Sequence, residues 1–262
     1  MKNYINKHTI MGMMSKHYIP FDDFKGFYKG KNKDKVVVFD KNFSVSNYKE
    51  VNYYYIFDKP EPKIKNMYHS NLLVSHFDSE YFKLEGKKNK EIREARNKYN
   101  KIITIKKDVE NVDSVISLID KWDEISGIKY GWNRHSGYDR SFFLKYYEKE
   151  KDNLYSLFFY FNDVLVGYSV VSNIVEDNCF KYVIRKLDIS IGRNMGLYID
   201  FKTFENLYNV YGGEFYVNWG ASSGNVLKYK KKFPVFSEDK VWFYKIKGEN
   251  VDQQDAIRFD EF

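Results

Sequence analysis

The stretch Lys181–Phe233 constrains the fold more than any other part of the chain. Its pattern predicts a strand, a small-residue loop, a helix, a second strand, another loop and a short helix. Gly212-Gly213 predicts the end of the longer helix, because glycine adopts the left-handed conformation at a helix C-terminus without steric cost. Within that helix apolar residues follow a 3.6-residue period, at Leu197, Phe201, Phe204, Tyr208 and Tyr211.

The loop Ile191–Leu197 opens directly onto this helix. The first turn of a helix exposes backbone N–H groups that lack a partner within the helix, and it carries the positive end of the helix dipole. Such a loop is suited to bind an anion, for example a pyrophosphate. After the next predicted strand, Glu214–Trp219, the segment Gly220–Asn225 is expected to be a second loop.

Composition limits the classes of protein to which the chain can belong. Apolar residues make up 43% of it and aromatic residues 19%, which excludes a disordered chain. A length of 262 residues fits one large domain or two small ones. The net charge of +7 fits an anionic partner, such as a nucleic acid, a nucleotide cofactor or an acidic surface, and it equally fits a solvated basic surface.

The residue inventory also excludes several kinds of site. Cys179 is the only cysteine, which rules out an internal disulfide and a Cys-rich zinc site, and the five histidines lack metal-ligand spacing. We therefore expect no bound metal. The sequence has no run of about 18 apolar residues and no apolar core of a signal peptide near its N-terminus, and this predicts a cytoplasmic location.

The other elements are predicted from local patterns. Residues 1–34 have weak periodicity and are expected to be irregular or peripheral, whereas Asn162-Asp163 is a two-residue turn that tolerates positive φ within a hairpin. Asp139 is expected to cap the N-terminus of a helix. Further helices are expected at Lys90–Lys101, Val112–Ile125 and Arg140–Glu150. Further strands are expected at Val36–Phe39, Tyr53–Phe57, Ser70–Phe77, Ile102–Lys107, Leu154–Phe161, Val164–Asn173, Cys179–Leu187, Val235–Phe236 and Lys240–Ile246.

Two basic segments are candidate contact surfaces. The loop Gly127–Gly137 combines aromatic and basic residues, among them Trp132 and Arg134, which fits stacking on a base or packing within the loop itself. The helix Lys90–Lys101 and the residues before it fit either a solvated charged surface or a contact with an anionic substrate. Their positive charge is concentrated at Lys87, Lys88, Arg93 and Arg96.

The order of these elements resembles that of the GNAT acyltransferase fold. Arg193-x-x-Gly196-x-Tyr198 resembles the family's [Q/R]-x-x-G-x-[G/A] loop, which binds the pyrophosphate of coenzyme A through backbone N–H groups. Tyr198 stands where the family has a small residue, so its side chain is expected to crowd the phosphates. The hairpin segment Asn162–Tyr168 looks like that of the family, and Tyr229 keeps the tyrosine of its N-x-x-A-x-x-x-Y segment.

Within this fold the chain is most similar to Fem-type aminoacyltransferases and to the transferase domain of phosphatidylglycerol lysyltransferases. Lys87–Lys98 resembles their basic helix. Asn218–Ser222, followed by Tyr229-Lys230, is similar to their strand and Gly-Gly-Ser segment that leads to a Phe-Lys pair. The resemblance covers about Phe82 to Tyr244.

This resemblance implies an α/β (α+β) fold, with a GNAT-like mixed central sheet flanked by helices. Fem-type enzymes carry two GNAT-like units. Residues 1–82 are therefore expected to be a degenerate first unit or an extension, 83–247 the acyltransferase domain, and 248–262 a polar tail.

The resemblance also implies a site between two splayed strands. Tyr229 is the candidate general acid for the leaving thiolate, with packing as the alternative, and Asp188 is a candidate base or amine-orienting group. No Ser-His-Asp or Cys-His set stands out, so a covalent acyl-enzyme is not expected. The expected cofactor-binding residues are Leu187, Ile189, Gly192, Arg193, Asn194, Met195, Gly196, Leu197, Ser222 and Asn225, the last two with helix capping as an alternative. The expected substrate-binding residues are Asn218, Trp219, Trp132, Arg134, Arg93 and Arg96.

Three functions remain open at this point. The first is an N-acyltransferase that uses acyl-CoA and an amine acceptor on a small molecule, a protein or a modified nucleobase. The second is a Fem-type transferase whose donor is aminoacyl-tRNA, which the basic composition favours. The third is a GNAT-like protein that has lost its chemistry and binds nucleic acid.

Overall fold

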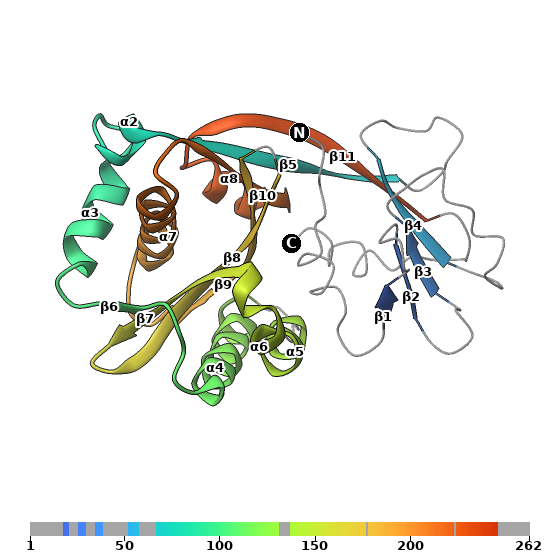
Figure 1. The fold of residues 1–262 in the computed structure, drawn as a ribbon, viewed down its shortest axis with the longest axis horizontal. Helices are drawn as coiled ribbons and strands as arrows, with labels where there is room; N and C mark the ends of the chain where they lie inside the picture. Colours follow the sequence, from blue (N-terminus) through green and yellow to red (C-terminus); the bar gives the residue numbers. More distant parts are fainter. Residues whose placement is uncertain are drawn as a thin grey trace.

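The computed structural model describes residues 67–130, 137–176, 178–222 and 224–245 and, before them, four short strands (Figure 1). The strands are β1 (Tyr18–Pro20), β2 (Gly26–Lys29), β3 (Lys35–Val38), β4 (Asn52–Phe57), β5 (Met67–Phe77), β6 (Thr104–Lys106), β7 (Leu154–Phe161), β8 (Val164–Glu176), β9 (Cys179–Leu187), β10 (Phe215–Ser222) and β11 (Val235–Lys245). The helices are α2 (Ser79–Phe82), α3 (Lys90–Tyr99), α4 (Val112–Tyr130), α5 (Gly137–Lys145), α6 (Tyr147–Glu150), α7 (Met195–Tyr211) and α8 (Gly224–Lys230), with a 3-10 turn, η1, at Lys151–Asn153.

These strands form one mixed sheet in the order β1-β2-β3-β4-β11-β5-β10-β9-β8-β7-β6. The pairs β3/β4 and β9/β10 are parallel, and the other neighbouring pairs are antiparallel. The two long strands β5 and β11 run from the helical part of the molecule to β1–β4 (Figure 1). Because β5 lies between β11 and β10, the residues before Lys83 supply an inner strand to the sheet that carries α7.

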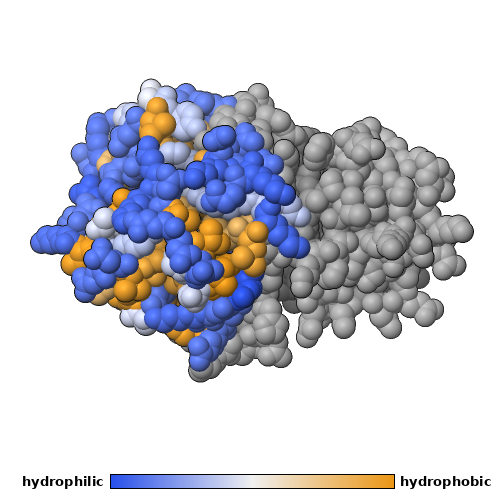
Figure 2. All heavy atoms as spheres, turned by 60° about the horizontal axis from the view of Figure 1, so that its bottom comes forward, coloured by the Kyte–Doolittle hydropathy of each residue, from blue (hydrophilic) through white to orange (hydrophobic). Residues whose placement is uncertain are grey.

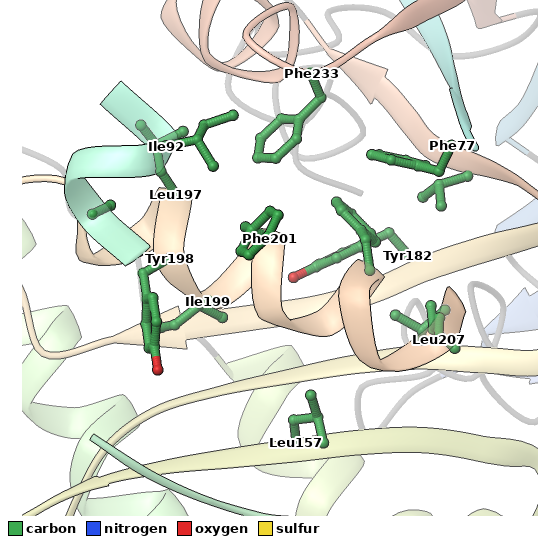
Figure 3. Close-up of a cluster of buried hydrophobic side chains, with 14 of the residues drawn as sticks. Phe77, Ile92, Leu157, Tyr182, Leu197, Tyr198, Ile199, Phe201, Leu207 and Phe233 are labelled. Atoms are coloured by element: carbon green, nitrogen blue, oxygen red, sulfur yellow. The ribbon is translucent and has the colours of Figure 1, made fainter. Parts of the chain in front are cut away.

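Helices cover both faces of the sheet, and alternate residues of β7 show this directly. Leu157 and Phe159 belong to a core that contains α7, whereas Phe158 and Tyr160 belong to a second core with α4, α5 and α6. Figure 3 shows Ile92 of α3, Tyr182 of β9 and other buried side chains gathered around α7. The site described below lies where these two layers meet the diverging ends of β9 and β10.

Most elements predicted from local pattern are confirmed. The helix α7 ends at Gly212, whose φ is 72°, as glycine in the left-handed region should. The hairpin β7–β8 turns through Asn162 and Asp163, with φ values of 47° and 63°. Both features depend on neighbouring residues alone, which explains why the sequence predicts them.

Several expectations were wrong, because tertiary pairing overrides local pattern. Residues 1–34 were expected to be irregular or peripheral; they are not irregular, because they contain β1 and β2, but β1 is an edge strand of the sheet. The last two predicted strands are the single strand β11, which pairs with β5 and β4 along its length. Likewise β10 continues to Ser222 by pairing with β5, so most of the predicted loop Gly220–Asn225 is strand or helix.

Two further corrections concern helices. α4 continues to Tyr130, into the predicted loop, and residues 131–136 lie outside the described part of the chain. Asp139 is not an N-cap, since α5 begins at Gly137. The predicted tail 248–262 also lies outside the described residues.

The coloured part of the face drawn in Figure 2 is largely hydrophilic, with apolar residues exposed between the charged ones. No helix in the described ranges combines the length and the apolar character needed to cross a lipid bilayer.

Gly167 on β8 allows α7 to approach the sheet, since a Cβ there would lie 2.5 Å from Cδ1 of the fully buried Ile199. We expect Gly167→Ala to destabilise the protein by about 1–3 kcal/mol through overpacking, measured by chemical denaturation. Ile199→Val removes that Cδ1, so the double variant should lose much less than the sum of the two single variants.

Gly213→Ala is the matched control, because a Cβ at Gly213 has no neighbour within 4 Å. It should change the free energy of unfolding by no more than about 0.5 kcal/mol. Strict additivity of the Gly167 and Ile199 variants would contradict this account of the packing.

Candidate functional site

The strands β9 and β10 form a fork. Their parallel pairing covers only Tyr216–Asn218 against Cys179–Lys181, and both strands continue beyond it. At this point β10 has an irregularity between Asn218 and Ala221, where the Asn218 side chain accepts the Gly220 N–H at 2.8 Å. A bulge of this kind bends a strand and ends its pairing, so the fork opens toward the C-terminal ends of both strands.

The loop that follows β9 leads into α7, whose first turn has no acidic residue and no side-chain cap. Asn194, at the N-cap, adopts the left-handed conformation with φ 66°. α3 holds the loop: the Tyr99 hydroxyl donates to the Arg193 carbonyl at 2.8 Å. A Cβ on Gly192 would lie 3.1 Å from Lys98 Nζ, and the φ of Gly192 is 131°, so a glycine is required there.

The predicted cofactor-binding residues of this loop thus lie together at the start of α7. The side chains of Met195 and Leu197 are buried in the core, so only their backbone groups face the loop. Tyr198 does not crowd this place as expected. Its ring is buried against Tyr99 and Phe159, with centroid distances of 5.5 and 6.1 Å, because its helical position directs it toward α3 and β7.

A buried polar network fills the space between β9, α7 and α8. Asp200 of α7 accepts the Tyr182 hydroxyl at Oδ1 and the Tyr229 hydroxyl at Oδ2, each at 2.6 Å. Arg185 of β9 forms an ion pair with the same carboxylate at 2.6 Å and donates to the Tyr229 oxygen at 2.6 Å. Tyr229 is therefore fixed by two charged partners rather than by apolar packing alone.

The network also reaches the start of α7. Arg185 donates to the Gly196 carbonyl at 3.3 Å. A Cβ on Gly196 would lie 3.1 Å from Arg185 Nη1 and 3.3 Å from the Tyr229 hydroxyl, so the glycine gives both side chains room. Burial raises the pKa of Tyr229 well above its usual value, against the opposing effect of Arg185. Its hydroxyl thus keeps its proton at neutral pH and is a donor.

Sequence reasoning missed Arg185, Asp200 and Tyr182. Asp200 could have been found, because a carboxylate three residues after Leu197 falls on the buried side of α7. Arg185 could not, because a register shift in the β8–β9 pairing places Tyr182 and Arg185 on one face although they are three residues apart.

Two lysines lie at the fork, Lys181 buried and Lys230 half-buried. Lys181 donates to Asn218 Oδ1 at 3.2 Å, and Lys230 of α8 donates to the Trp219 carbonyl at 2.7 Å and to the Ser222 hydroxyl. The pKa of each lysine is lowered to about 7, chiefly by burial, and for Lys230 the charges of Lys181 and Arg185 contribute to this lowering. Both ammonium groups are therefore partly neutral at physiological pH.

The face of β9 opposite α7 carries a second set of charges. Asp188 is buried and forms an ion pair with Lys121 of α4, and it accepts the Ser190 N–H at 2.9 Å. Burial raises the pKa of Asp188, but the hydrogen bonds from Lys121 and Ser190 outweigh it and lower the pKa overall. Asp188 is thus an ionised group suited to orient a cation more than to remove a proton.

The remaining predicted residues are dispersed. The Trp219 ring is a core residue rather than a substrate contact, stacked 5.1 Å from Tyr182 with its Nε1 donating to Ser75 at 2.8 Å. Arg93 likewise holds the turn before α3, by donating to the carbonyls of Leu84 and Gly86.

Others remain available or lie elsewhere. Asn225 is exposed in the first turn of α8, and Arg96, Leu187 and Ile189 are half-buried. Trp132 and Arg134 lie outside the described residues. Within those residues no three His, Cys, Asp or Glu side chains form a group that could hold a metal ion.

The two lysines at the fork predict a pH dependence of stability. The unfolded chain keeps both protonated up to about pH 10.5, whereas the folded protein releases these protons from about pH 7. The unfolded state therefore binds more protons in this window, and the free energy of unfolding should rise with pH, by less than about 1.4 kcal/mol per pH unit for each lysine.

Chemical denaturation between pH 7 and 9 measures this slope. Lys230→Met should make it shallower, whereas Lys149→Met, which replaces an exposed lysine of α6, should leave it unchanged. Parallel pH curves for the protein and its Lys230→Met variant would contradict the assignment.

Comparison with known proteins gives a structural likeness only. No family model matches the sequence, and no curated protein matches it. A conserved protein of unknown function from Bacteroides thetaiotaomicron is similar with a TM-score of 0.59 and 13% identity, over 85% of this chain and 82% of that one. The C-terminal domain of a protein provisionally assigned as a lysylphosphatidylglycerol synthetase, from Agrobacterium fabrum, has a TM-score of 0.59 and 11% identity over 98% and 91%.

L-PGS from Bacillus licheniformis is similar with a TM-score of 0.56 and 11% identity, over 96% of this chain and 90% of that one. At such identities the likeness shows the fold alone. The mixed sheet flanked by helices is accordingly the fold of these structures, and it has the mixed central sheet that the resemblance to the GNAT fold predicted.

Proposed function

We propose that the chain is an acyltransferase that holds a phosphorylated acyl carrier at the start of α7 and transfers the acyl group within the fork to an amine acceptor. One observation carries the proposal: the uncapped first turn of α7 lies beside the fork, next to the fixed hydroxyl of Tyr229. Backbone N–H groups there suit a phosphate, and the nearby hydroxyl suits a departing oxygen or sulfur atom.

Among donors, we favour aminoacyl-tRNA over acyl-CoA. Arg185 and Tyr229 already line the first turn at Gly196, which leaves less room there for a pyrophosphate in the usual coenzyme A position. Positive charge also spreads beyond that turn, over Arg193, Lys232 and the exposed lysines of the α3 region, with Glu91 as a counter-charge. A wide basic surface suits the backbone of a nucleic acid.

The fold likeness is compatible with this preference, since one similar structure is named as a domain of a lysylphosphatidylglycerol synthetase, a name that contains an aminoacyl group. Acyl-CoA remains the second candidate, because the Arg193-x-x-Gly196 loop resembles the sequence that binds its pyrophosphate. A protein that only binds nucleic acid is the third. It would bind tRNA and transfer nothing.

The chain's own residues supply three contributions to such a transfer. The acceptor ammonium group first loses a proton to solvent, and the free amine attacks the acyl carbonyl carbon. The bond from that carbon to the carrier then breaks, and the proton that the nitrogen releases replaces the one that Tyr229 gives to the departing atom. Tyr229 turns its hydroxyl from Asp200 to the departing atom and gives it the proton, and Arg185, 2.6 Å from the Tyr229 oxygen, stabilises the negative charge that Tyr229 acquires. Asp188 orients an approaching ammonium group from the α4 side.

Incubation of the full chain with labelled aminoacyl-tRNA, and separately with labelled acetyl-CoA, together with primary-amine acceptors tests the proposal. Transfer of label from tRNA to an amide product supports the favoured donor. Transfer of label from acetyl-CoA alone supports acyl-CoA, the second candidate. Tight tRNA binding without turnover of either donor would reject an enzymatic role.

We expect the double variant Lys98→Glu/Arg193→Glu to weaken tRNA binding at least about tenfold and to reduce the slope of log K against log salt by about 1–2. Lys145→Glu/Lys149→Glu makes the same charge change on exposed residues of α5 and α6 and should have a smaller effect. Equal losses in both double variants would show that the attraction is not localised at the start of α7.

Tyr229→Phe and Tyr182→Phe form a matched pair, because each removes one hydroxyl that donates to Asp200 at 2.6 Å. Both should lower the free energy of unfolding by about 1–3 kcal/mol. Only Tyr229→Phe should also lower kcat, by about 10²-fold or more. If the two variants lose kcat equally, Tyr229 has only a structural role.

A further inference from the structure

The ammonium group of Lys186 is held in a pocket of two unlike groups. Its Nζ lies 3.8 Å from the centroid of the Trp122 ring of α4 and 3.0 Å from Asp139 Oδ2 of α5. The exposed fractions of the Lys186 and Asp139 side chains are 16% and 5%, so the pair is largely removed from water. We refer to Trp122 and Asp139 as the ammonium pocket.

The chemistry of this pocket suits an alkylammonium ion. The face of an indole ring attracts a cation, and the attraction is stronger when the cation is desolvated. Asp139 lies in the first turn of α5, where the helix dipole favours a carboxylate. Its Oδ2 is buried and lies 3.0 Å from Lys186 Nζ, in a contact that is poorly directed as a hydrogen bond.

A cation is therefore required here for a physical reason. Burial raises the pKa of Asp139, whereas the charge of Lys186 lowers it, so without a cation the carboxylate would be disfavoured. Lys186 balances the charge of the carboxylate at 3.0 Å, but its contact with Oδ2 is poorly directed as a hydrogen bond. A free ammonium ion, unconstrained by a backbone, can balance the charge and also donate a well-directed hydrogen bond.

The position of the pocket links it to the fork. Lys186 belongs to β9, and Asp188 follows directly after the end of this strand. Both side chains lie on the face of the sheet that α4 and α5 cover. Lys121, the partner of Asp188, directly precedes Trp122. The pocket is thus next to the end of β9 from which the loop to α7 departs, on the face opposite α7.

We propose that the ammonium pocket is a binding subsite for the amine-bearing acceptor, and that Lys186 occupies it as an internal cation which the acceptor replaces. The assignment to the acceptor rests on the proposed function, whereas the preference of the pocket for an alkylammonium ion does not. An internal occupant lowers the apparent affinity for the acceptor by the fraction of molecules in which it fills the pocket.

Lys186→Ala in the full chain tests the pocket directly. It removes three carbons and the ammonium group, which n-propylammonium chloride replaces atom for atom. Titration with n-propylammonium should raise the Tm of this variant in a saturable manner, whereas propan-1-ol, which lacks the charge, should not. If the variant does not fold alone, the yield of refolded protein in each solute gives the same comparison.

Two control variants sharpen the result. Lys121→Ala empties a site whose lysine is 49% exposed, and n-propylammonium should have a much smaller effect on it. In the double variant Lys186→Ala/Asp139→Asn the effect should disappear. A response to propan-1-ol equal to that of n-propylammonium, or a response that survives Asp139→Asn, would overturn the assignment of the pocket.

The acceptor assignment is tested in the transfer assay. Vacating the pocket should lower the KM for a primary-amine acceptor several-fold in Lys186→Ala relative to the unaltered protein, because the internal competitor is gone. An unchanged or higher KM overturns the acceptor assignment. Rescue by n-propylammonium without any transfer activity rejects the proposed function and retains the pocket. Transfer activity without rescue retains the proposed function and rejects the pocket.

Discussion

The buried carboxylate of Asp200 is the interaction on which the rest of the site depends. It receives two tyrosine hydroxyls and an arginine, and these partners come from β9 and α8, whereas Asp200 itself belongs to α7. A single buried charge without such partners would cost several kcal/mol, so the three elements are held in one arrangement. The fork remains a defined site because this network fixes the side of it that faces α7.

The two faces of β9 present different chemical environments on the two sides of the fork. Arg185 and Tyr229 line the side of α7, where the backbone of the first helical turn and the basic residues of α3 suit a phosphorylated carrier. Asp188 and Lys186 belong to the side of α4 and α5, where carboxylates and an indole ring suit a cation. In the reaction proposed above, an anionic donor and a cationic acceptor would approach from opposite sides of the same opening.

Sequence and structure agree where a feature depends on neighbours along the chain. The helix α7, its end at Gly212 and the turn at Asn162 follow from local periodicity and from residues that tolerate positive φ. The loop before α7 could be found for the same reason. These features required no knowledge of which strands pair.

Features that depend on pairing could not be derived in this way. The register shift within β9 reverses the alternation of side chains, so Arg185 is assigned to the wrong face by any simple pattern. Trp122 and Asp139 lie on different helices and meet at Lys186 only in the folded chain. Trp219 was assigned to substrate because its strand was recognised, but its direction depends on the packing around Tyr182.

The place of β5 in the sheet has a consequence for how separable the parts of this molecule are. Because β5 precedes Lys83 yet pairs on both sides, with β11 and β10, a fragment that starts after Phe82 would lack an inner strand. Both flanking strands would then present unpaired backbone groups, a surface that invites aggregation. The GNAT-like part therefore cannot be excised or transplanted at that boundary, because it requires the segment that supplies β5.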